Sequence, residues 1–495
     1  MGVILDAFAG TVAENRRRIA IHAPSENVSR TFGDLESDVA DFTAAFAKLR
    51  LPSRPTIVSN VGNHSGFIPL FMAALASGGA FLAVDGDAPA TELLALADTC
   101  GADLVVIRRG AEAIDQLAPM PLPCGLIGSV RRVDSPPGWC PTPETGPLVL
   151  RLTSGSTRTS KVVIASEQNL FSDGKQISEG MGIGRGDVNL ATIPLAHAYG
   201  MGNLVMPLLL RGSSIVLRDS FLPAQWTSDI AAFGITVFPS VPFIFDCLKR
   251  MGDAAASVAR LRLCVTAGAP IDLRTLKYFK QDLGVKIHSL YGTTETGGIT
   301  YDSSDSLSET VSVGWPLPDT TVSLMPVDGA AASEGRVRVQ GAAVARGYAD
   351  DSPSGERSSE FVNSGFLTAD LGTLASDGQL RLLGRVSSFI NVAGRKVHPR
   401  EVEQVILELP GVEHASVLGV DRGVRGEELV ACVYRRGSDL TAAQIRRHCA
   451  AVLSPYKVPK RVVFGDELPV TGRGKFDRRA IELLVRDAER EPKGI

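Results

Sequence analysis

The sequence predicts an α/β fold: a large N-terminal domain of mostly parallel sheets covered on both faces, and a smaller α+β C-terminal domain. Short apolar runs alternate with helical patterns up to about residue 290, and short strands with turns dominate from about residue 320. The 495 residues also exceed what one hydrophobic core usually serves. We therefore expect an N-terminal domain at 1–385, which includes a β-rich submodule at 320–385, and a C-terminal domain at 386–495.

The elements of the N-terminal domain follow from apolar spacing. An amphipathic helix is predicted where apolar residues recur every three or four positions, at Leu35, Val39, Phe42, Phe46 and Leu49. The uncharged segment 66–84 predicts a buried helix, a glycine turn and a strand rather than a membrane span, because Gly78 and Gly79 interrupt it. Apolar runs predict strands at 56–61, 80–84, 103–107, 148–152, 189–193, 213–217, 235–241, 261–266 and 285–290.

The remaining elements are shorter. The β-rich submodule contains predicted strands at 336–340 and 379–383. In the C-terminal domain we expect two helices, at 399–409 and 440–453. Three strands accompany them, at 415–420, 429–435 and 461–464.

Composition excludes several classes of protein. A formal net charge of −3 argues against bulk nucleic-acid binding. The seven cysteines never form a C-x-x-C pair, which argues against a disulfide framework or a zinc site and favours a reducing compartment. Residues 1–9 carry Asp6 and no basic segment, so no signal peptide is expected. With no membrane span predicted either, we expect a cytoplasmic protein.

The segment 153–161 is the strongest candidate for a binding loop. It follows the predicted strand 148–152 and is rich in small and hydroxyl side chains, ending in Lys161. Such a loop offers backbone N–H groups, hydroxyls and an ammonium group to phosphate oxygens. The Gly-x4-Gly-Lys spacing of a Walker A loop is missing, so we expect a nucleotide bound by another scheme.

Five further stretches complete a pattern. They are PLAHAYG at 194–200, YGTTET at 291–296, TADLG at 368–372, GR at 384–385 with GRKVHPREVE at 394–403, and PVTGRGK at 469–475. Together with loop 153–161, and in this order, they resemble the adenylate-forming superfamily of acyl-CoA synthetases, firefly luciferase and nonribosomal-peptide adenylation domains. The resemblance covers nearly the whole chain.

The resemblance implies two half-reactions and a small, mobile C-terminal domain. A carboxylate first attacks the α-phosphorus of ATP, with Mg²⁺ bound, to give acyl-AMP and pyrophosphate. The C-terminal domain then rotates about a hinge near Ser387, and the thiol of CoA attacks the acyl-adenylate. The loop at Gly394 would line the tunnel for the thiol. Ser387 stands where the family usually has Asp.

The resemblance also implies a set of nucleotide contacts. Phosphate contacts would come from Thr153, Ser154, Gly155, Ser156, Thr157 and Lys161. Thr294 would bond the α-phosphate, and Glu295 would bind Mg²⁺. Asp370 and Arg385 would bond the ribose, although a structural salt bridge is the alternative. The remaining nucleotide contacts would be Gly268, Ala269, Pro270, Tyr291, Gly292 and Thr293.

Arg158 departs from this family pattern, because it stands where the family has Gly. An arginine enters glycine-only conformations at a cost, yet it brings a bidentate phosphate donor.

The acyl site is expected around His197, whose other interpretation is a satisfied, buried histidine. Candidate pocket walls are His197, Phe238, Val241, Phe243 and Gly268, which favours an apolar acyl or aryl group. Amino-acid-activating relatives usually place an aspartate just after this motif, whereas Ala198, Tyr199, Gly200 and Met201 follow here. We therefore expect a carboxylic acid without an α-amino group.

Two alternatives remain beside an acid–CoA ligase. One is a freestanding acyl-AMP ligase that loads an acyl carrier protein, since both acceptors present a phosphopantetheine thiol. The other is a catalytically weakened nucleotide-binding protein, suggested by Arg158 and Ser387.

The role of Lys475 gives a direct test. Its ammonium group would bridge the carboxylate and the α-phosphate in the first half-reaction, with Thr294 and His197 as the other candidate catalytic residues. Lys475→Ala is therefore expected to abolish acyl-AMP formation and largely spare thioester formation from supplied acyl-AMP. Pyrophosphate release and thioester formation would be measured separately, and equal loss of both steps would contradict this role.

Overall fold

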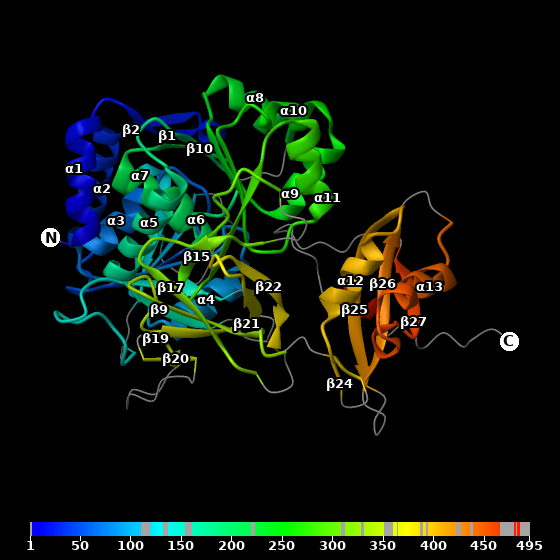
Figure 1. Ribbon diagram of the computed structural model, residues 1–495. Helices are drawn as coiled ribbons and strands as arrows, with labels where there is room; N and C mark the ends of the chain where they lie inside the picture. Colours follow the sequence, from blue (N-terminus) through cyan, green and yellow to red (C-terminus); the bar gives the residue numbers. More distant parts are fainter. Residues whose placement is uncertain are drawn as a thin grey trace. The chain divides into compact units, whose positions relative to one another are not determined.

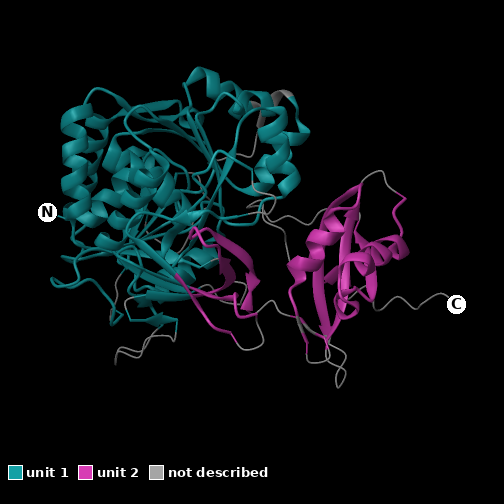
Figure 2. Ribbon diagram, viewed as in Figure 1, with its two compact units in different colours: residues 1–322, 338–367 teal, residues 323–337, 368–495 magenta. Residues whose placement is uncertain are grey.

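The computed structural model describes most of the chain and divides it into two compact units. The described residues are 2–109, 119–131, 137–153, 161–218, 223–307, 312–327, 331–350, 360–363, 365–386, 390–392, 395–421, 427–435, 439–465, 480–481 and 483–485. Unit 1 comprises residues 1–322 and 338–367, and unit 2 comprises 323–337 and 368–495 (Figure 2). The α/β fold class is confirmed. The predicted domain boundary at residue 385 stays a prediction.

Unit 1 contains a nine-stranded sheet with a parallel centre. In spatial order its strands are β16 (Trp315–Pro316), β15 (Gly297–Tyr301), β14 (Ile287–Thr293), β13 (Leu263–Thr266), β12 (Val237–Ser240), β10 (Val188–Ala191), β11 (Ser214–Leu217), β1 (Ile19–Ala23) and β2 (Val28–Thr31). The pairs from β14 through to β1 are parallel, and the outer pairs are antiparallel. Strands β10 to β14 are the predicted apolar runs, which confirms them.

A second, eight-stranded sheet has the same plan. Its strands are β19 (Gly347–Tyr348), β9 (Val162–Ser166), β8 (Leu148–Leu152), β4 (Ala80–Ala83), β3 (Thr56–Ser59), β5 (Leu104–Arg108), β7 (Leu126–Val130) and β6 (Met120–Pro121). Strands β3, β4, β5 and β8 pair in parallel, as expected for strands buried on both faces. The flanking pairs are antiparallel, and sequence analysis did not predict β6, β7, β9 or β19.

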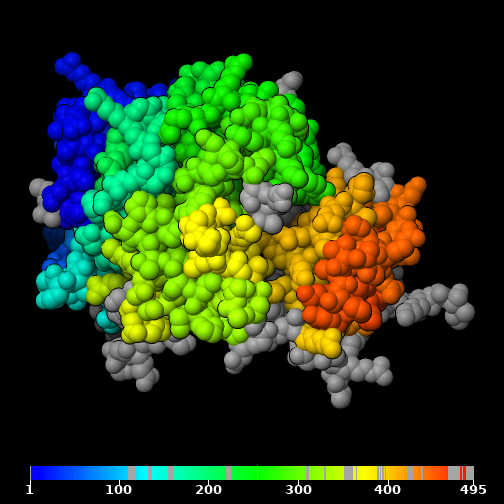
Figure 3. All heavy atoms as spheres, in the orientation of Figure 1, coloured from blue at the N-terminus to red at the C-terminus, as the bar shows by residue number. Residues whose placement is uncertain are grey.

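Helices cover these sheets (Figure 1). They are α1 (Val3–Asn15), α2 (Phe32–Lys48), α3 (Phe67–Ala76), α4 (Ala90–Thr99), α5 (Glu167–Met181), α6 (Ala198–Gly200), α7 (Met206–Arg211), α8 (Pro223–Ala232), α9 (Pro242–Arg250), α10 (Asp253–Val258) and α11 (Leu273–Lys277). Helix α1 lies on the surface of unit 1, where its atoms are blue in Figure 3. Helix α3 is the predicted buried helix, and Phe67 and Phe71 pack against Phe81 of β4.

Short helical turns and a smaller sheet complete this part of the chain. The turns are η1 (Pro24–Glu26), η2 (Pro123–Gly125), η3 (Met201–Val205) and η4 (Tyr278–Asp282). The smaller sheet is the predicted β-rich submodule. Its strands are β17 (Thr320–Met325), β18 (Gly335–Gly341), β21 (Gly365–Leu374) and β20 (Phe361–Val362), with β22 (Leu380–Arg385) paired to β21.

The C-terminal part of unit 2 is an α+β body. Its helices are α12 (Pro399–Leu407) and α13 (Ala442–Val452), followed by the turn η7 (Pro455–Lys457). Its strands are β23 (Ile390–Val392), β24 (Arg395–Val397), β25 (Val412–Asp421), β26 (Glu427–Arg435) and β27 (Arg461–Gly465). Its core contains Val402, Ile406, Ala431 and Ile445. The predicted helices and strands of this domain correspond to α12, α13, β25, β26 and β27, which confirms them. Among the described residues, no helix is both long and apolar enough to span a membrane.

One buried ion pair joins β8 to α5. Arg151 Nη2 lies 3.7 Å from Asp173 Oδ2, and the two side chains are 3% and 0% exposed. Burial raises the pKa of the Asp173 carboxyl to about 6, against the lowering effects of Arg151 and of the Gly298 amide. Both residues also bond the segment after β14: Arg151 Nη1 donates to the Thr294 carbonyl in the turn, and Asp173 Oδ1 accepts from Gly298 N at the start of β15.

Breaking this pair is expected to destabilise unit 1. Arg151→Leu leaves a buried carboxylate without its cation, which should lower the free energy of unfolding by about 3–5 kcal/mol. The double variant Arg151→Leu/Asp173→Asn should recover most of that loss, because neither charge remains.

Thermal unfolding would measure these effects. The matched control is Arg211→Leu, which removes one of two cationic partners of Glu179 at the surface (Arg211 37% and Glu179 39% exposed) and should cost less than about 1 kcal/mol. Equal small losses for Arg151→Leu and the control would contradict a structural role for the buried pair.

Candidate active site

Four neighbouring parallel strands end at one edge of the nine-stranded sheet. In spatial order these are β14, β13, β12 and β10, and the predicted site residues of unit 1 outside loop 153–161 lie on these strands or in the segments that follow them. His197 follows β10, Val241 and Phe243 follow β12, and Glu295 follows β14. Ligands of α/β sheets usually bind at this edge. The topology therefore brings together segments that lie far apart in the sequence.

The turn between β14 and β15 presents Thr294 and Glu295. Thr293 Oγ1 and Thr296 Oγ1 lie 3.1 Å apart across it. Gly297 has φ +67°, and a Cβ atom there would lie 2.2 Å from the Asp173 carboxylate, so only glycine fits. Together with the Arg151 bond to the Thr294 carbonyl, these contacts hold the turn against the buried ion pair.

Glu295 accepts two hydrogen bonds from the segment 345–348. Its carbonyl accepts from Ala345 N at 2.8 Å, and its Oε1 accepts from the Tyr348 hydroxyl at 2.8 Å. Oε2 makes no hydrogen bond or ion pair with another of the described residues. Lys161 Nζ lies 4.4 Å from the centre of the Tyr348 ring. Tyr348 therefore contacts both the predicted metal ligand and the predicted phosphate lysine.

The surroundings of Glu295 suit Mg²⁺ that is shared with a nucleotide. In the described part of the chain, no group of three or more His, Cys, Asp or Glu side chains comes together to bind a metal. Mg²⁺ commonly takes one or two carboxylates and completes its shell with water and substrate phosphates. A single carboxylate with one oxygen turned to a hydroxyl donor fits that arrangement.

The predicted phosphate loop is described only at its ends. Thr153 N donates to the Lys161 carbonyl at 3.0 Å, and Lys161 N donates to Thr153 Oγ1 at 3.0 Å. These two bonds close the base of the loop. The predicted residues Ser154, Gly155, Ser156 and Thr157 lie outside the described residues, as do Arg158, Ser387, Gly394 and Lys475.

His197 is paired with a carboxylate that sequence analysis missed. Its Nε2 lies 2.8 Å from Oδ1 of Asp85, which follows β4 of the eight-stranded sheet. The His197 side chain is 31% exposed and that of Asp85 only 7%, so the ring has a partner without being buried. A carboxylate directly after a buried parallel strand is a signal that the sequence contained.

The other predicted acyl residues differ in exposure. Phe238 is fully buried and packs between Trp226 and Phe245, with ring centres 6.1 Å and 5.5 Å away. Val241 and Phe243 are partly exposed against the same core. Tyr199 donates its hydroxyl towards the carbonyls of Ser240 and Val265, which ties together the ends of β12 and β13. Burial raises the pKa of this hydroxyl well above its usual value.

The structure also describes the residues predicted to contact adenine and ribose. Residues 268–270 form an exposed turn after β13, where Gly268 has φ +82°, while Tyr291 is buried and Gly292 exposed at the end of β14. In unit 2, Asp370 and Arg385 are register partners on β21 and β22. Arg385 Nε donates to Asp370 Oδ1 at 3.1 Å, and the side chains are 52% and 13% exposed. This geometry agrees with the ribose interpretation and equally with the salt-bridge alternative.

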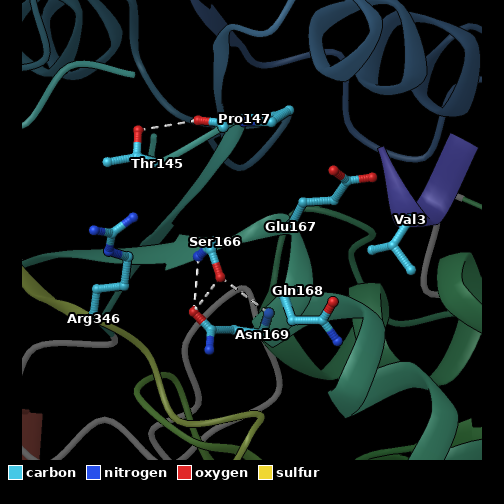
Figure 4. Close-up of a pocket in the computed structure, with 9 residues that line it drawn as sticks. Val3, Thr145, Pro147, Ser166, Glu167, Gln168, Asn169 and Arg346 are labelled. Carbon is cyan, nitrogen blue, oxygen red and sulfur yellow. Dashed lines mark hydrogen bonds between the residues drawn. The ribbon is translucent and has the colours of Figure 1, made fainter. Parts of the chain in front are cut away.

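A shallow pocket of about 400 Å³ lies elsewhere in unit 1 (Figure 4). Its lining includes Glu167 at the start of α5, Ser166, Asn169 and Arg346. Glu167 already accepts the Ile4 amide at 2.7 Å, and Ser166 and Asn169 form the capping box of α5. None of the five predicted acyl residues, all of which the structure describes, lines this pocket. Glu167, Ser166 and Asn169 are therefore committed to the fold.

Comparison with known proteins identifies the family. The model of the AMP-binding enzymes matches residues 8–349, and the model of their C-terminal domain matches 401–475. A sulfoacetate–CoA ligase of Cupriavidus necator is 32% identical over 347 residues, which cover 68% of this chain and 67% of that protein. A feruloyl-CoA synthase of an Amycolatopsis species is 27% identical over 481 residues, covering 94% of this chain and 97% of that one.

The fold agrees with this assignment. The crystal structure of ATP-bound MatB from Rhodopseudomonas palustris superimposes with a TM-score of 0.86 at 22% identity, over 99% of this chain and 100% of that one. We conclude that the chain belongs to the family of AMP-binding enzymes, the adenylate-forming superfamily, among whose members its curated relatives are acid–CoA ligases.

Proposed function

We propose that this protein is an AMP-forming acid–CoA ligase acting on an acyl or aryl acid without an α-amino group. The supporting observation is the turn with Thr294 and Glu295 at the edge of the nine-stranded sheet. Glu295 accepts a hydrogen bond from the Tyr348 hydroxyl, and Lys161 Nζ lies over the Tyr348 ring. The CoA-ligase activity of the curated relatives supports the choice of reaction.

In the proposed first half-reaction, a carboxylate oxygen of the acid bonds to the α-phosphorus of ATP, and the bond to the pyrophosphate oxygen breaks. Lys161 would neutralise the leaving phosphates, Thr294 would donate to the α-phosphate, and Lys475 would bridge carboxylate and phosphate oxygens. Glu295 would hold Mg²⁺, which shields the phosphate charge. Asp370 and Arg385 would bond the ribose hydroxyls.

In the proposed second half-reaction, the CoA sulfur attacks the acyl carbonyl carbon and AMP leaves with the electron pair of the anhydride bond. Ser387 would be the hinge for the change between the two steps, and the Gly394 loop would line the path of the thiol. His197, held by Asp85, would border the carboxylate of the acid in the first step and the acyl group of the adenylate in the second.

The choice of acid differs among the relatives. Named relatives act on acids as different as sulfoacetate, 2-succinylbenzoate and ferulate. Val241 and Phe243 near the expected pocket favour an apolar group. CoA is preferred over an acyl carrier protein as acceptor because these relatives are CoA ligases or synthases. The retained Glu295, Asp370 and Arg385 argue against a weakened binding protein.

A screen of carboxylic acids for ATP–pyrophosphate exchange tests this proposal. We expect exchange with at least one aliphatic or aromatic acid that lacks an α-amino group, and thioester formation when CoA is added. Mass spectrometry of the thioester would identify the product. Exchange with amino acids alone, or thioester formation with a holo-carrier protein and not with CoA, would contradict it.

The Asp85–His197 pair gives a second test. Because Asp85 fixes the orientation of the ring, Asp85→Asn should raise the KM for the acid about tenfold and change the KM for ATP less than twofold. The matched control is Glu408→Gln, which alters an exposed pair with His448 in unit 2. Steady-state kinetics would measure both constants, and equal changes in the two KM values would show that Asp85 does not act through the acyl site.

A further inference from the structure

Glu295 is attached to one short segment at two points. The segment is 345–348, which donates Ala345 N to the Glu295 carbonyl and the Tyr348 hydroxyl to Oε1, both at 2.8 Å. One bond fixes the backbone of the predicted metal ligand, and the other fixes its carboxylate. Free rotation of the carboxylate is thereby restricted.

The segment 345–348 is itself tied to the strand that follows the phosphate loop. Strand β19 pairs antiparallel with β9, with Tyr348 opposite Val163. Arg346 N donates to the Ile164 carbonyl, and Ala349 N donates to the Val162 carbonyl, both at 2.8 Å. Strand β9 begins one residue after Lys161. The backbone therefore places Tyr348 beside the end of the loop.

The Tyr348 side chain is well held. It is 7% exposed, and its ring meets that of Phe361 edge to face, with centres 5.3 Å apart. Lys161 Nζ lies over the Tyr348 ring at 4.4 Å from its centre, within the range of a cation–π contact. A buried ring thus faces the lysine with its π surface and the glutamate with its hydroxyl.

These contacts have a chemical consequence for both neighbours. A hydroxyl that bonds one carboxylate oxygen orients the other towards a cation, and loss of such an outer partner typically lowers metal affinity 10–100-fold. A ring below an ammonium group restricts where that charge can lie. One side chain can therefore fix the relative positions of a metal ligand and a phosphate contact.

We propose that Tyr348 is a positioning residue that sets Glu295 for Mg²⁺ through its hydroxyl and Lys161 for the ATP phosphates through its ring. This inference rests on the proposed function, because it takes Glu295 and Lys161 as contacts of Mg²⁺ and ATP. It adds to that function a residue that touches neither substrate nor metal and acts through its two neighbours.

Two substitutions separate the two actions of Tyr348. Tyr348→Phe removes the hydroxyl and keeps the ring below Lys161. Tyr348→Leu removes both. The matched control is Tyr278→Phe, which deletes the hydroxyl of a tyrosine whose ring lies near Lys249, 5.8 Å from its centre, in another part of unit 1. Glu295→Gln serves as the reference for loss of the metal ligand.

Calorimetric titration of the full-length protein with ATP, with and without Mg²⁺ and without any acid, gives the readout. We expect Mg²⁺ to tighten ATP binding in the wild type and in Tyr278→Phe. In Tyr348→Phe this gain should fall about tenfold, while ATP binding without Mg²⁺ stays unchanged. Tyr348→Leu should in addition weaken ATP binding without Mg²⁺ by a few-fold.

The outcomes distinguish this inference from the proposed function. If Tyr348→Phe keeps the wild-type gain from Mg²⁺ while Glu295→Gln loses it, the positioning role is wrong and the metal role of Glu295 stands. If Glu295→Gln also keeps the gain, the proposed metal site itself is wrong. Equal weakening by Tyr348→Phe with and without Mg²⁺ would indicate a general structural defect and overturn the inference. A matching thermal unfolding midpoint confirms that each variant is folded.

Discussion

The buried ion pair between Arg151 and Asp173 is the constraint on which the site geometry depends. A carboxylate that is 0% exposed requires a compensating charge and hydrogen-bond donors, and Asp173 receives the charge of Arg151 at 3.7 Å and a hydrogen bond from the Gly298 amide. Those same requirements position the turn after β14, because Arg151 also bonds the Thr294 carbonyl. A charged core pair, which costs free energy to bury, thereby determines where Thr294 and Glu295 lie.

A second constraint acts on that turn through segment 345–348. Segment 345–348 binds the backbone and the carboxylate of Glu295 and is itself paired with β9. Strands β8 and β9 flank the loop 153–161, and they pair with each other in the eight-stranded sheet. Arg151 on β8 and Tyr348 on β19 both belong to the eight-stranded sheet, and each bonds the turn that follows β14 of the nine-stranded sheet. These contacts connect the two sheets of unit 1 at the site. The turn after β14 is therefore held in part by residues on strands of the eight-stranded sheet.

The sequence predicted the parallel centre of each sheet well, because strands such as β4 are apolar throughout and bounded by turn residues. It did not predict β6, β7, β9 or β19, and the two-residue strands β6 and β19 have no period to detect. Candidate site residues were found by their motifs, whereas their partners were not. Tyr348 lies 53 residues from Glu295, and such long-range pairings have no local signature.

The ion pairs of the two units differ in a way that bears on their roles. Arg385 is 52% exposed, so its bond to Asp370 contributes little to stability and opens at little cost. A ligand hydroxyl can then replace one partner without a large penalty, which suits a pair that binds ribose. Arg151 and Asp173 cannot exchange partners in this manner, because separation would leave a buried charge uncompensated. The more exposed pair, Asp370 and Arg385, can therefore exchange one partner for a ligand hydroxyl. The buried pair, Arg151 and Asp173, can only hold the turn in position.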